Sequence, residues 1–129
     1  MRLAVTGGRA FANRDFVFYQ LDRWHAGKPI GLLIHGGANG ADSLAQEWAI
    51  ERGITYVVFP VTPSEYSEYG RAAPLRRNLR MLIDGAPDDL LAFPGFRGTE
   101  HCVQTALKLR IPVTRAGFYI WPGAVNANG

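Results

Sequence analysis

The chain has 129 residues, of which 47% are hydrophobic, and 14 basic against 11 acidic side chains give it a formal net charge of +3. This composition predicts one folded domain, and it excludes a disordered chain and a protein that coats nucleic acid by charge alone. The single cysteine, Cys102, excludes an internal disulfide, and the sequence has no signal-peptide pattern and no apolar stretch of membrane length. We therefore expect a cytoplasmic protein with no membrane association.

Short apolar runs alternate with segments of helical period along the chain. The expected strands are residues 2–6, 31–35, 54–59, 90–93 and 111–114, and the expected helices are residues 11–26, 41–52, 75–84 and a final one up to residue 110. Asn13 is a suitable N-cap for the first helix, and Gly53 is suited to end the second in a left-handed conformation. Thr99 is the expected N-cap of the last helix.

The segment 60–73 is expected to be irregular, because two prolines and Gly70 interrupt it. The basic helix that follows has Leu75, Leu79, Leu82 and Ile83 as its expected inward face. Residues 1–116 form the expected domain, and residues 117–129 are a C-terminal tail.

The alternation of strands and helices predicts an α/β fold, a Rossmann-like doubly wound sandwich with a mostly parallel sheet of about five strands in the order 3-2-1-4-5. Three of these strands, which are neighbours in that order, end in glycine turns, at Gly7-Gly8, Gly36-Gly37 and Gly95–Gly98. Ligands bind such sheets at the carboxyl ends of the strands, and a helix N-terminus attracts anions. We therefore expect a phosphate site there, although the glycines are also compatible with tight strand-to-helix connections alone.

Four motifs in this order resemble a known family. They are TGGRAF (residues 6–11), HGGANGADSLAQEWA (35–49), RRNLRML (76–82) and AFPGFRGT (92–99). Together they resemble the YspA/YpsA-related branch of the SLOG superfamily, which also includes the lonely-guy phosphoribohydrolases and the DprA/Smf proteins. The resemblance covers about residues 1–113, and it implies a Rossmann-like domain that binds nucleotides or nucleotide-derived ligands in the glycine-lined crevice.

The resemblance also shows where this chain departs from the lonely-guy enzymes. Those enzymes cleave an N-glycosidic bond with an arginine from RKxxM and a glutamate from PGGxGTxxE. Arg77 matches the arginine, but Asn78 stands at the lysine, Phe96 at the second glycine of PGG, and Cys102 at the glutamate. Glu100 is two residues early, which turns its side chain by roughly 200° on a helix. We therefore expect a binding crevice without turnover.

Thirteen residues are candidates for ligand binding. They are Gly7, Gly8, Arg9, Gly36, Gly37, Asn39, Asp42, Arg77, Asn78, Gly95, Arg97, Gly98 and Thr99. Arg77 either binds a phosphate through its forked guanidinium or is a solvated helix residue. Asp42 either caps its helix or contacts a ribose hydroxyl. Asn78 either contacts the ligand or braces a neighbouring loop.

Other residues carry two interpretations each. His35 is a core histidine or a general base, and Cys102 is a small core residue or a thiol activated by a helix N-terminus. Tyr66 and Tyr69 stack on a base or pack against the sheet edge. No residues show metal-ligand spacing, so we expect neither metal nor cofactor.

Three functions are compatible with these residues, and we give them in order of preference. The first is binding or sensing of a nucleotide or nucleotide-derived ligand without turnover. The second is a phosphoribohydrolase-like N-glycosidase that acts on a nucleoside monophosphate, with Arg77 and an acid such as Glu100 or Asp42. The third is single-stranded nucleic-acid binding through the basic run 71–80, which the small charge excess makes the weakest. The aromatic residues 118–121 either fold over the sheet or form a patch that a second subunit covers, and the superfamily resemblance favours a homodimer.

Overall fold

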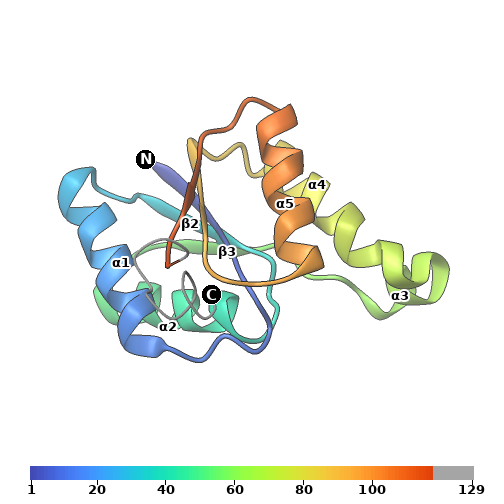
Figure 1. Cartoon of the computed structure of the whole chain (residues 1–129), viewed down its shortest axis with the longest axis horizontal. Coiled ribbons are helices and arrows are strands. Elements are labelled where there is room, and N and C mark those ends of the chain that lie inside the picture. The colour runs from blue at the N-terminus through green and yellow to red at the C-terminus, as the bar shows by residue number, and fades with distance from the viewer. Residues whose placement is uncertain (118–129) are drawn as a thin grey trace, which may run out of the picture.

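A five-stranded sheet runs through the middle of the molecule (Figure 1). The computed structural model describes residues 1–117. The strands lie in the order β3-β2-β1-β4-β5, and all four neighbouring pairs are parallel. Their bounds are β1 (Arg2–Thr6), β2 (Leu32–His35), β3 (Tyr56–Val58), β4 (Asp89–Ala92) and β5 (Val113–Arg115). The expected α/β class and strand order are confirmed.

Helices cover both faces of this sheet. They are α1 (Arg14–Gly27), α2 (Ala41–Arg52), α4 (Ala73–Asp84) and α5 (Arg97–Lys108). A further helix, α3 (Pro63–Tyr69), packs on α4. Successive strand residues point to opposite faces, so Leu3 and Val5 join the core beneath α1 and α2, whereas Ala4 joins the core beneath α4 and α5. The three central strands, β1, β2 and β4, are buried on both faces, as is usual in parallel sheets, whereas the edge strands β3 and β5 are only partly buried. No helix within residues 1–117 has the length and apolarity needed to cross a bilayer.

The local signals for two helix ends are confirmed. The Asn13 side chain accepts a hydrogen bond from the N–H of Phe16 (3.1 Å) at the start of α1. Gly53 ends α2 with a φ of 70°, the left-handed conformation expected of it. Trp48, in the last half of α2, lies fully buried on the inward face of that helix.

The expectation of an irregular segment over residues 60–73 is wrong. This segment holds α3 and a 3-10 turn (Gly70–Ala72). Thr62 and Glu65 form a capping box, in which the Thr62 hydroxyl accepts from the Glu65 N–H and the Glu65 carboxylate accepts from the Thr62 N–H. The prolines at positions 60 and 63 predict an interruption of regular structure, but Pro63 occupies the first position of α3, where its missing N–H costs no hydrogen bond.

The expected inward face of α4 is wrong in part. Leu82 is buried as expected, but Leu79 and Ile83 are 44% and 53% exposed. The helix instead buries Ala73, Arg77, Asn78 and Met81. The polar pair lies under the loops at the carboxyl edge of the sheet, where backbone groups are available as partners. The tail expected over residues 117–129 lies almost wholly outside the described residues.

Candidate functional site

The loops after β1, β2 and β4 meet at one edge of the sheet, as the strand order requires. The N–H of Gly8, after β1, donates a hydrogen bond to the carbonyl oxygen of Pro94, after β4 (2.9 Å). The carbonyl oxygen of Gly8 in turn accepts from the N–H of Ala41 at the start of α2 (3.2 Å). These bonds hold the loop after β1 between the other two.

Several of the predicted glycines have a packing role in this loop contact. A Cβ on Gly8 would lie 2.9 Å from the Pro94 oxygen, and a Cβ on Gly36 would lie 2.6 Å from the guanidinium carbon of Arg77. A Cβ on Gly95 would overlap the Thr99 hydroxyl. The tight-connection interpretation of the glycines is therefore correct for these three positions.

Gly98 differs from those glycines. It is the second residue of α5 and is exposed, and a Cβ there would meet nothing within 4 Å. Glycine in a helix is about 1 kcal/mol less favourable than alanine, and packing does not require it here. The missing side chain leaves the first helical turn open, where N–H groups lack acceptors within the helix.

The expectation that Thr99 caps α5 is wrong. The helix begins two residues earlier, at Arg97, and its N-cap is Phe96, whose side chain makes no capping hydrogen bond. Thr99 is buried, with its hydroxyl against Gly95. Backbone N–H groups at the start of α5 therefore receive no side-chain cap.

A cavity of about 860 Å³ opens over this turn, and we call it the larger cavity. It lies between the loops after β1 and β4 and the start of α4, and its lining is Gly8, Arg9, Ala10, Phe11, Arg71, Pro74, Leu75, Pro94, Gly95, Phe96, Arg97, Gly98 and Thr99. Three arginines and no carboxylate belong to this lining. A hollow between α3 and α4 lacks this bias, because Glu65, Glu68 and Asp84 line it together with arginines.

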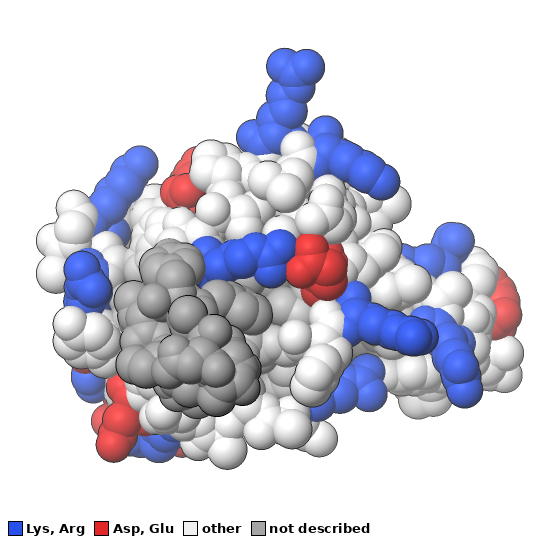
Figure 2. Space-filling view, viewed as in Figure 1, with Lys and Arg blue, Asp and Glu red and all other residues white. Residues whose placement is uncertain are grey.

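The three arginines of the larger cavity, Arg9, Arg71 and Arg97, are exposed and make no ion pair with any residue of 1–117. The ion pairs of that part of the chain use Arg14, Arg52, Arg80 and Arg115 instead. Figure 2 shows basic side chains gathered between the start of α5 and α3. The larger cavity thus carries positive charge that forms no ion pair with a carboxylate of residues 1–117.

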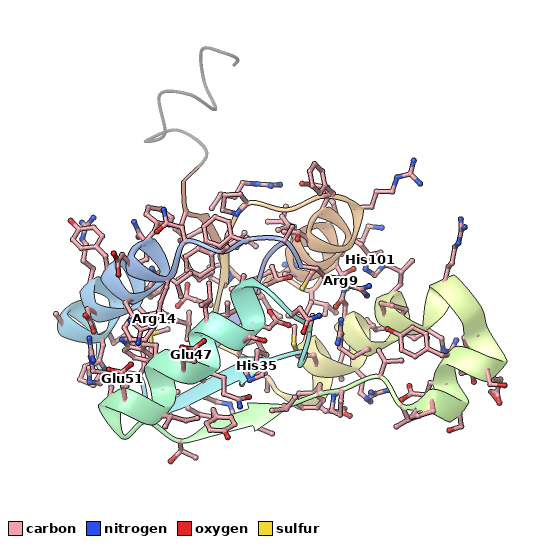
Figure 3. All side chains as sticks on the ribbon, turned by 90° about the horizontal axis from the view of Figure 1, so that it is seen from below. Arg9, Arg14, His35, Glu47, Glu51 and His101 are labelled. Carbon is pink, nitrogen blue, oxygen red and sulfur yellow. The ribbon has the colours of Figure 1, made fainter. Side chains whose placement is uncertain are left out.

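A second cavity of about 240 Å³, the smaller cavity, adjoins the loop after β2. Its lining is Arg9, Gly36, Gly37, Ala38, Asn39, Pro60, Val61, Tyr66 and Arg77. Arg9 belongs to both linings, and in Figure 3 it projects from the loop after β1 toward the end of the molecule where α4 and α5 lie. The two cavities therefore adjoin each other at Arg9.

Arg77 is not the solvated helix residue of the alternative interpretation, because only 8% of it is exposed. Its guanidinium donates to the carbonyl oxygens of Gly36 and Phe59 and, through Nε, to Asn78 Oδ1 (3.1 Å). Burial lowers the pKa of Arg77, and the Asp42 carboxylate opposes this shift. Arg77 thus braces the loop after β2, and its ligand contact stays a prediction.

Asn78 and Asp42 both organise loops. Asn78 Nδ2 donates to the carbonyl oxygen of Gly98 (3.2 Å), which is the bracing interpretation. Asp42 Oδ2 accepts from the N–H groups of Gly36 (3.1 Å) and Ala38 (3.2 Å), so this carboxylate holds the preceding loop rather than capping α2. Asp42 Oδ1 is buried without a hydrogen-bond partner among residues 1–117, and burial raises the pKa of this carboxyl to about 6.

His35 and Cys102 are buried structural residues, which is the first of the two interpretations given for each. The His35 ring accepts from the N–H of Gly37 at Nδ1 (3.0 Å), so Nε2 carries the proton and donates to Gln46 Oε1 (2.9 Å). Burial lowers the pKa of His35. Cys102 is fully buried, and burial raises the pKa of its thiol to about 12.

Glu100, the candidate acid, points away from both cavities. Its two carboxylate oxygens each accept from the Arg115 guanidinium at 2.9 Å, and Oε2 also accepts from Gln104 (2.8 Å). The hydrogen bonds from Arg115, and then from Gln104, lower the pKa of Glu100. No group of three metal-ligating side chains occurs within residues 1–117.

Most of the predicted site residues come together at this edge. Ten of the thirteen line one or both cavities, whereas Gly7, Asp42 and Asn78 lie beneath the lining. Sequence reasoning missed Arg71, Pro74, Leu75 and Phe96 as lining residues. The basic run from residue 71 was the signal for Arg71, but only the placement of α4 brings it to the larger cavity.

The parallel sheet and the glycine turns at its carboxyl edge define a Rossmann-like α/β domain. The chain belongs to the YspA, cpYpsA-related SLOG family, whose model matches residues 1–66. It is 40% identical over 124 residues to the Gene 61 protein of Mycobacterium phage D29, a match that covers 90% of this chain and 96% of that protein. The expected family is confirmed, and membership of it points to a nucleotide-related function.

A solved structure supports the same fold. The X-ray structure of TM1055, a structural genomics target, matches with a TM-score of 0.68 and 23% sequence identity. The match covers 87% of this chain and 71% of that chain.

Proposed function

We propose that the protein binds a nucleotide or nucleotide-derived ligand in the larger cavity, with a phosphate at the start of α5, and releases it unchanged. The observation that carries this proposal is the lining of the larger cavity. It combines three arginines without ion pairs among the described residues, no carboxylate, and the open helical turn at Gly98. Family membership agrees with a ligand of this class.

The chemistry of the lining favours a phosphate over other groups. Arginine forks match the geometry of phosphate oxygens, and the N-terminus of α5 adds free N–H groups and the positive end of the helix dipole. The volume, about 860 Å³, lies within the range of small-molecule sites. The apolar side chains of Phe11, Pro74 and Leu75 in the same lining suit a less polar part of the ligand.

The lack of an acid supports binding without turnover. Cleavage of an N-glycosidic bond calls for a positioned general acid or base, and no aspartate or glutamate lines either cavity. Cys102, which stands at the position of the lonely-guy glutamate, is buried in the core beneath α4 and α5. Glu100 is bound to Arg115 on the outside of α5.

One observation favours the alternative, a phosphoribohydrolase-like N-glycosidase. Asp42 lies under the floor of the smaller cavity with one unpartnered oxygen, and its pKa of about 6 is suitable for proton transfer. If Asp42 serves as the acid, purified protein releases free base from a nucleoside monophosphate. The release stops in Asp42→Asn and persists in Glu100→Gln.

The proposal is tested with a thermal-shift screen of nucleoside mono- and diphosphates, with free base followed by chromatography. A ligand at a hundred times its dissociation constant adds about 2.7 kcal/mol to the free energy of unfolding. The diagnostic variant is Gly98→Ala, whose methyl group has space in the free protein but would cover the helical turn. It should keep the fold and lose the ligand-induced shift.

Gly27→Ala is the matched control, because Gly27 ends α1 and a Cβ there also meets nothing within 4 Å. This variant should bind ligand like the wild type. A wild-type protein that no nucleotide stabilises would overturn the proposal. Equal ligand-induced shifts in Gly98→Ala and wild type would show that the phosphate does not bind at the start of α5.

The homodimer and the binding of single-stranded nucleic acid are separate proposals. Light scattering of the full chain at micromolar concentration tests the first, and a monomeric mass would exclude it. The second predicts binding to an oligonucleotide that weakens steeply with salt. We rank nucleic-acid binding last, because the arginines that make no ion pair within residues 1–117 surround a cavity.

A further inference from the structure

Phe96 is an exposed side chain that the fold does not use. Its exposed fraction is 86%, the highest among the large hydrophobic residues of the described chain. It occupies the N-cap position of α5, where serine, threonine, asparagine or aspartate would add about 1 kcal/mol through a capping hydrogen bond. Neither core packing nor helix capping therefore accounts for an aromatic residue at this position.

Phe96 lies on the wall of the cavity that is proposed to bind the nucleotide. Phe96 belongs to the lining of the larger cavity, immediately before Arg97 and two residues before Gly98. Two residues of chain span at most about 7 Å. The aromatic ring, the arginine and the open N–H turn are therefore close neighbours on one cavity lining, where one bound molecule can contact all three.

We propose that Phe96 is the stacking platform for the base of the bound nucleotide, and so determines that the site selects a nucleotide over a sugar phosphate. This inference rests on the proposed function, because the phosphate at the start of α5 positions the base. Stacking of a base on an aromatic ring contributes on the order of 1–3 kcal/mol, and every base has a π face. Phe96 therefore selects for the presence of a base rather than for one particular base.

The rest of the lining agrees with this role. Phe11, Pro74 and Leu75 supply apolar surface to the same cavity, and the lining has no acid to repel a phosphate. The other exposed aromatic residues lie outside this lining, namely Tyr19 on α1, Tyr56 on β3, and Tyr66 and Tyr69 on α3, of which Tyr66 lines the smaller cavity. An exposed ring next to charged groups suits a ligand that is planar at one end and anionic at the other.

The test distinguishes the contribution of the base to the affinity from that of the phosphate. Isothermal titration calorimetry measures the affinities of AMP, GMP, CMP, UMP and ribose 5-phosphate for wild type, Phe96→Ala and Phe96→Trp. In Phe96→Ala the affinity for the nucleotides should fall by about 5- to 150-fold, the range that 1–3 kcal/mol corresponds to, while the affinity for ribose 5-phosphate stays unchanged. Phe96→Trp should restore nucleotide binding, since a larger ring stacks at least as well.

Tyr19→Ala is the control for the loss of an exposed aromatic residue, and it should change no affinity. Melting temperatures confirm that each variant is folded, as the exposure of Phe96 leads us to expect. If Phe96→Ala binds nucleotides like the wild type while Gly98→Ala does not, the stacking role is wrong and the phosphate site stands. An equal loss of nucleotide and ribose 5-phosphate in Phe96→Ala also overturns the stacking role. If the wild type binds none of these compounds, the proposed nucleotide site itself fails, and the stacking role with it.

Discussion

Asn78 joins α4 to the first turn of α5, because its Nδ2 donates a hydrogen bond to the carbonyl oxygen of Gly98 over 3.2 Å. The same side chain accepts, through Oδ1, a hydrogen bond from Arg77 Nε (3.1 Å). Asn78 is buried, and it thus links the arginine that braces the loop after β2 to the turn proposed to hold a phosphate. The candidate site depends on this link between two helices.

Asn78→Ala should destabilise the fold by about 1–3 kcal/mol, because it leaves the buried Arg77 Nε without its acceptor. Urea unfolding followed by circular dichroism measures the change. Gln104→Ala removes an exposed amide whose side-chain hydrogen-bond partner within residues 1–117 is Glu100, and it should stay within about 0.5 kcal/mol of the wild type. A similar stability of both variants would show that the Asn78 link contributes little.

Arg9→Ala, Arg71→Ala and Arg97→Ala should each weaken nucleotide binding by about tenfold or more, since hydrogen bonds to charged groups contribute about 1.5–3 kcal/mol. Their melting temperatures should match the wild type, because the three side chains are exposed and make no ion pair within residues 1–117. Titration calorimetry gives the affinities. Arg23→Ala on α1 removes the same charge away from the cavities and should have no effect.

Arg77→Ala is a less informative test of ligand contact than these three variants. Its guanidinium bonds the carbonyl oxygens of Gly36 and Phe59, so the substitution leaves buried acceptors unsatisfied. We expect a fall in the free energy of unfolding of at least about 2 kcal/mol, measured in urea without ligand. Unchanged stability would mean that the bracing role is wrong and that Arg77 is available to a ligand.

The buried Asp42 should make stability depend on pH. Its pKa rises from 3.8 to about 6 on folding, so the folded state binds the proton more tightly than the unfolded state. The stabilisation from this proton is complete below about pH 4 and is lost as the pH rises through 6. About two pKa units correspond to at most about 3 kcal/mol.

Asp42→Asn should therefore be more stable than the wild type at pH 8 and similar to it at pH 4, because the amide oxygen can still accept from Gly36 and Ala38. Urea unfolding at both pH values measures this. Asp22→Asn is a control of opposite sign. The hydrogen bonds from Arg52 and Trp48 lower the pKa of Asp22, so its stabilisation is present above its unfolded pKa and is lost as the pH falls. Greater stability of wild type than Asp42→Asn at pH 8 would contradict the assignment.

Cys102 should resist thiol reagents in the native protein. It is fully buried and burial raises the pKa of its thiol to about 12, so neither access nor thiolate is available at neutral pH. Iodoacetamide labelling followed by mass spectrometry should modify the chain only in urea. Because Cys102 is the only cysteine, rapid labelling under native conditions would show directly that the core beneath α5 opens.

The sequence alone determined the α/β class, the strand order and the edge of the sheet where the glycine loops meet. Short apolar runs followed by glycine turns and helices allow few arrangements, because right-handed crossovers and parallel pairing limit the topology. The termini of α1 and α2 followed from local chemistry at Asn13 and Gly53. The capping box of α3 was also local, but its prolines led to the expectation of an irregular segment.

Only the tertiary structure decided which side chains serve the site. The pattern of α4 gave no reason to bury Arg77 and Asn78 and expose Leu79 and Ile83, since that choice depends on carbonyl oxygens of other loops. Likewise, the glycines look alike in the sequence, yet Gly95 is required by the hydroxyl of Thr99 whereas Gly98 faces open space. Hydrophobic periodicity and turn chemistry act over a few residues. The partners of a buried polar group and the space beside a glycine come from distant parts of the chain.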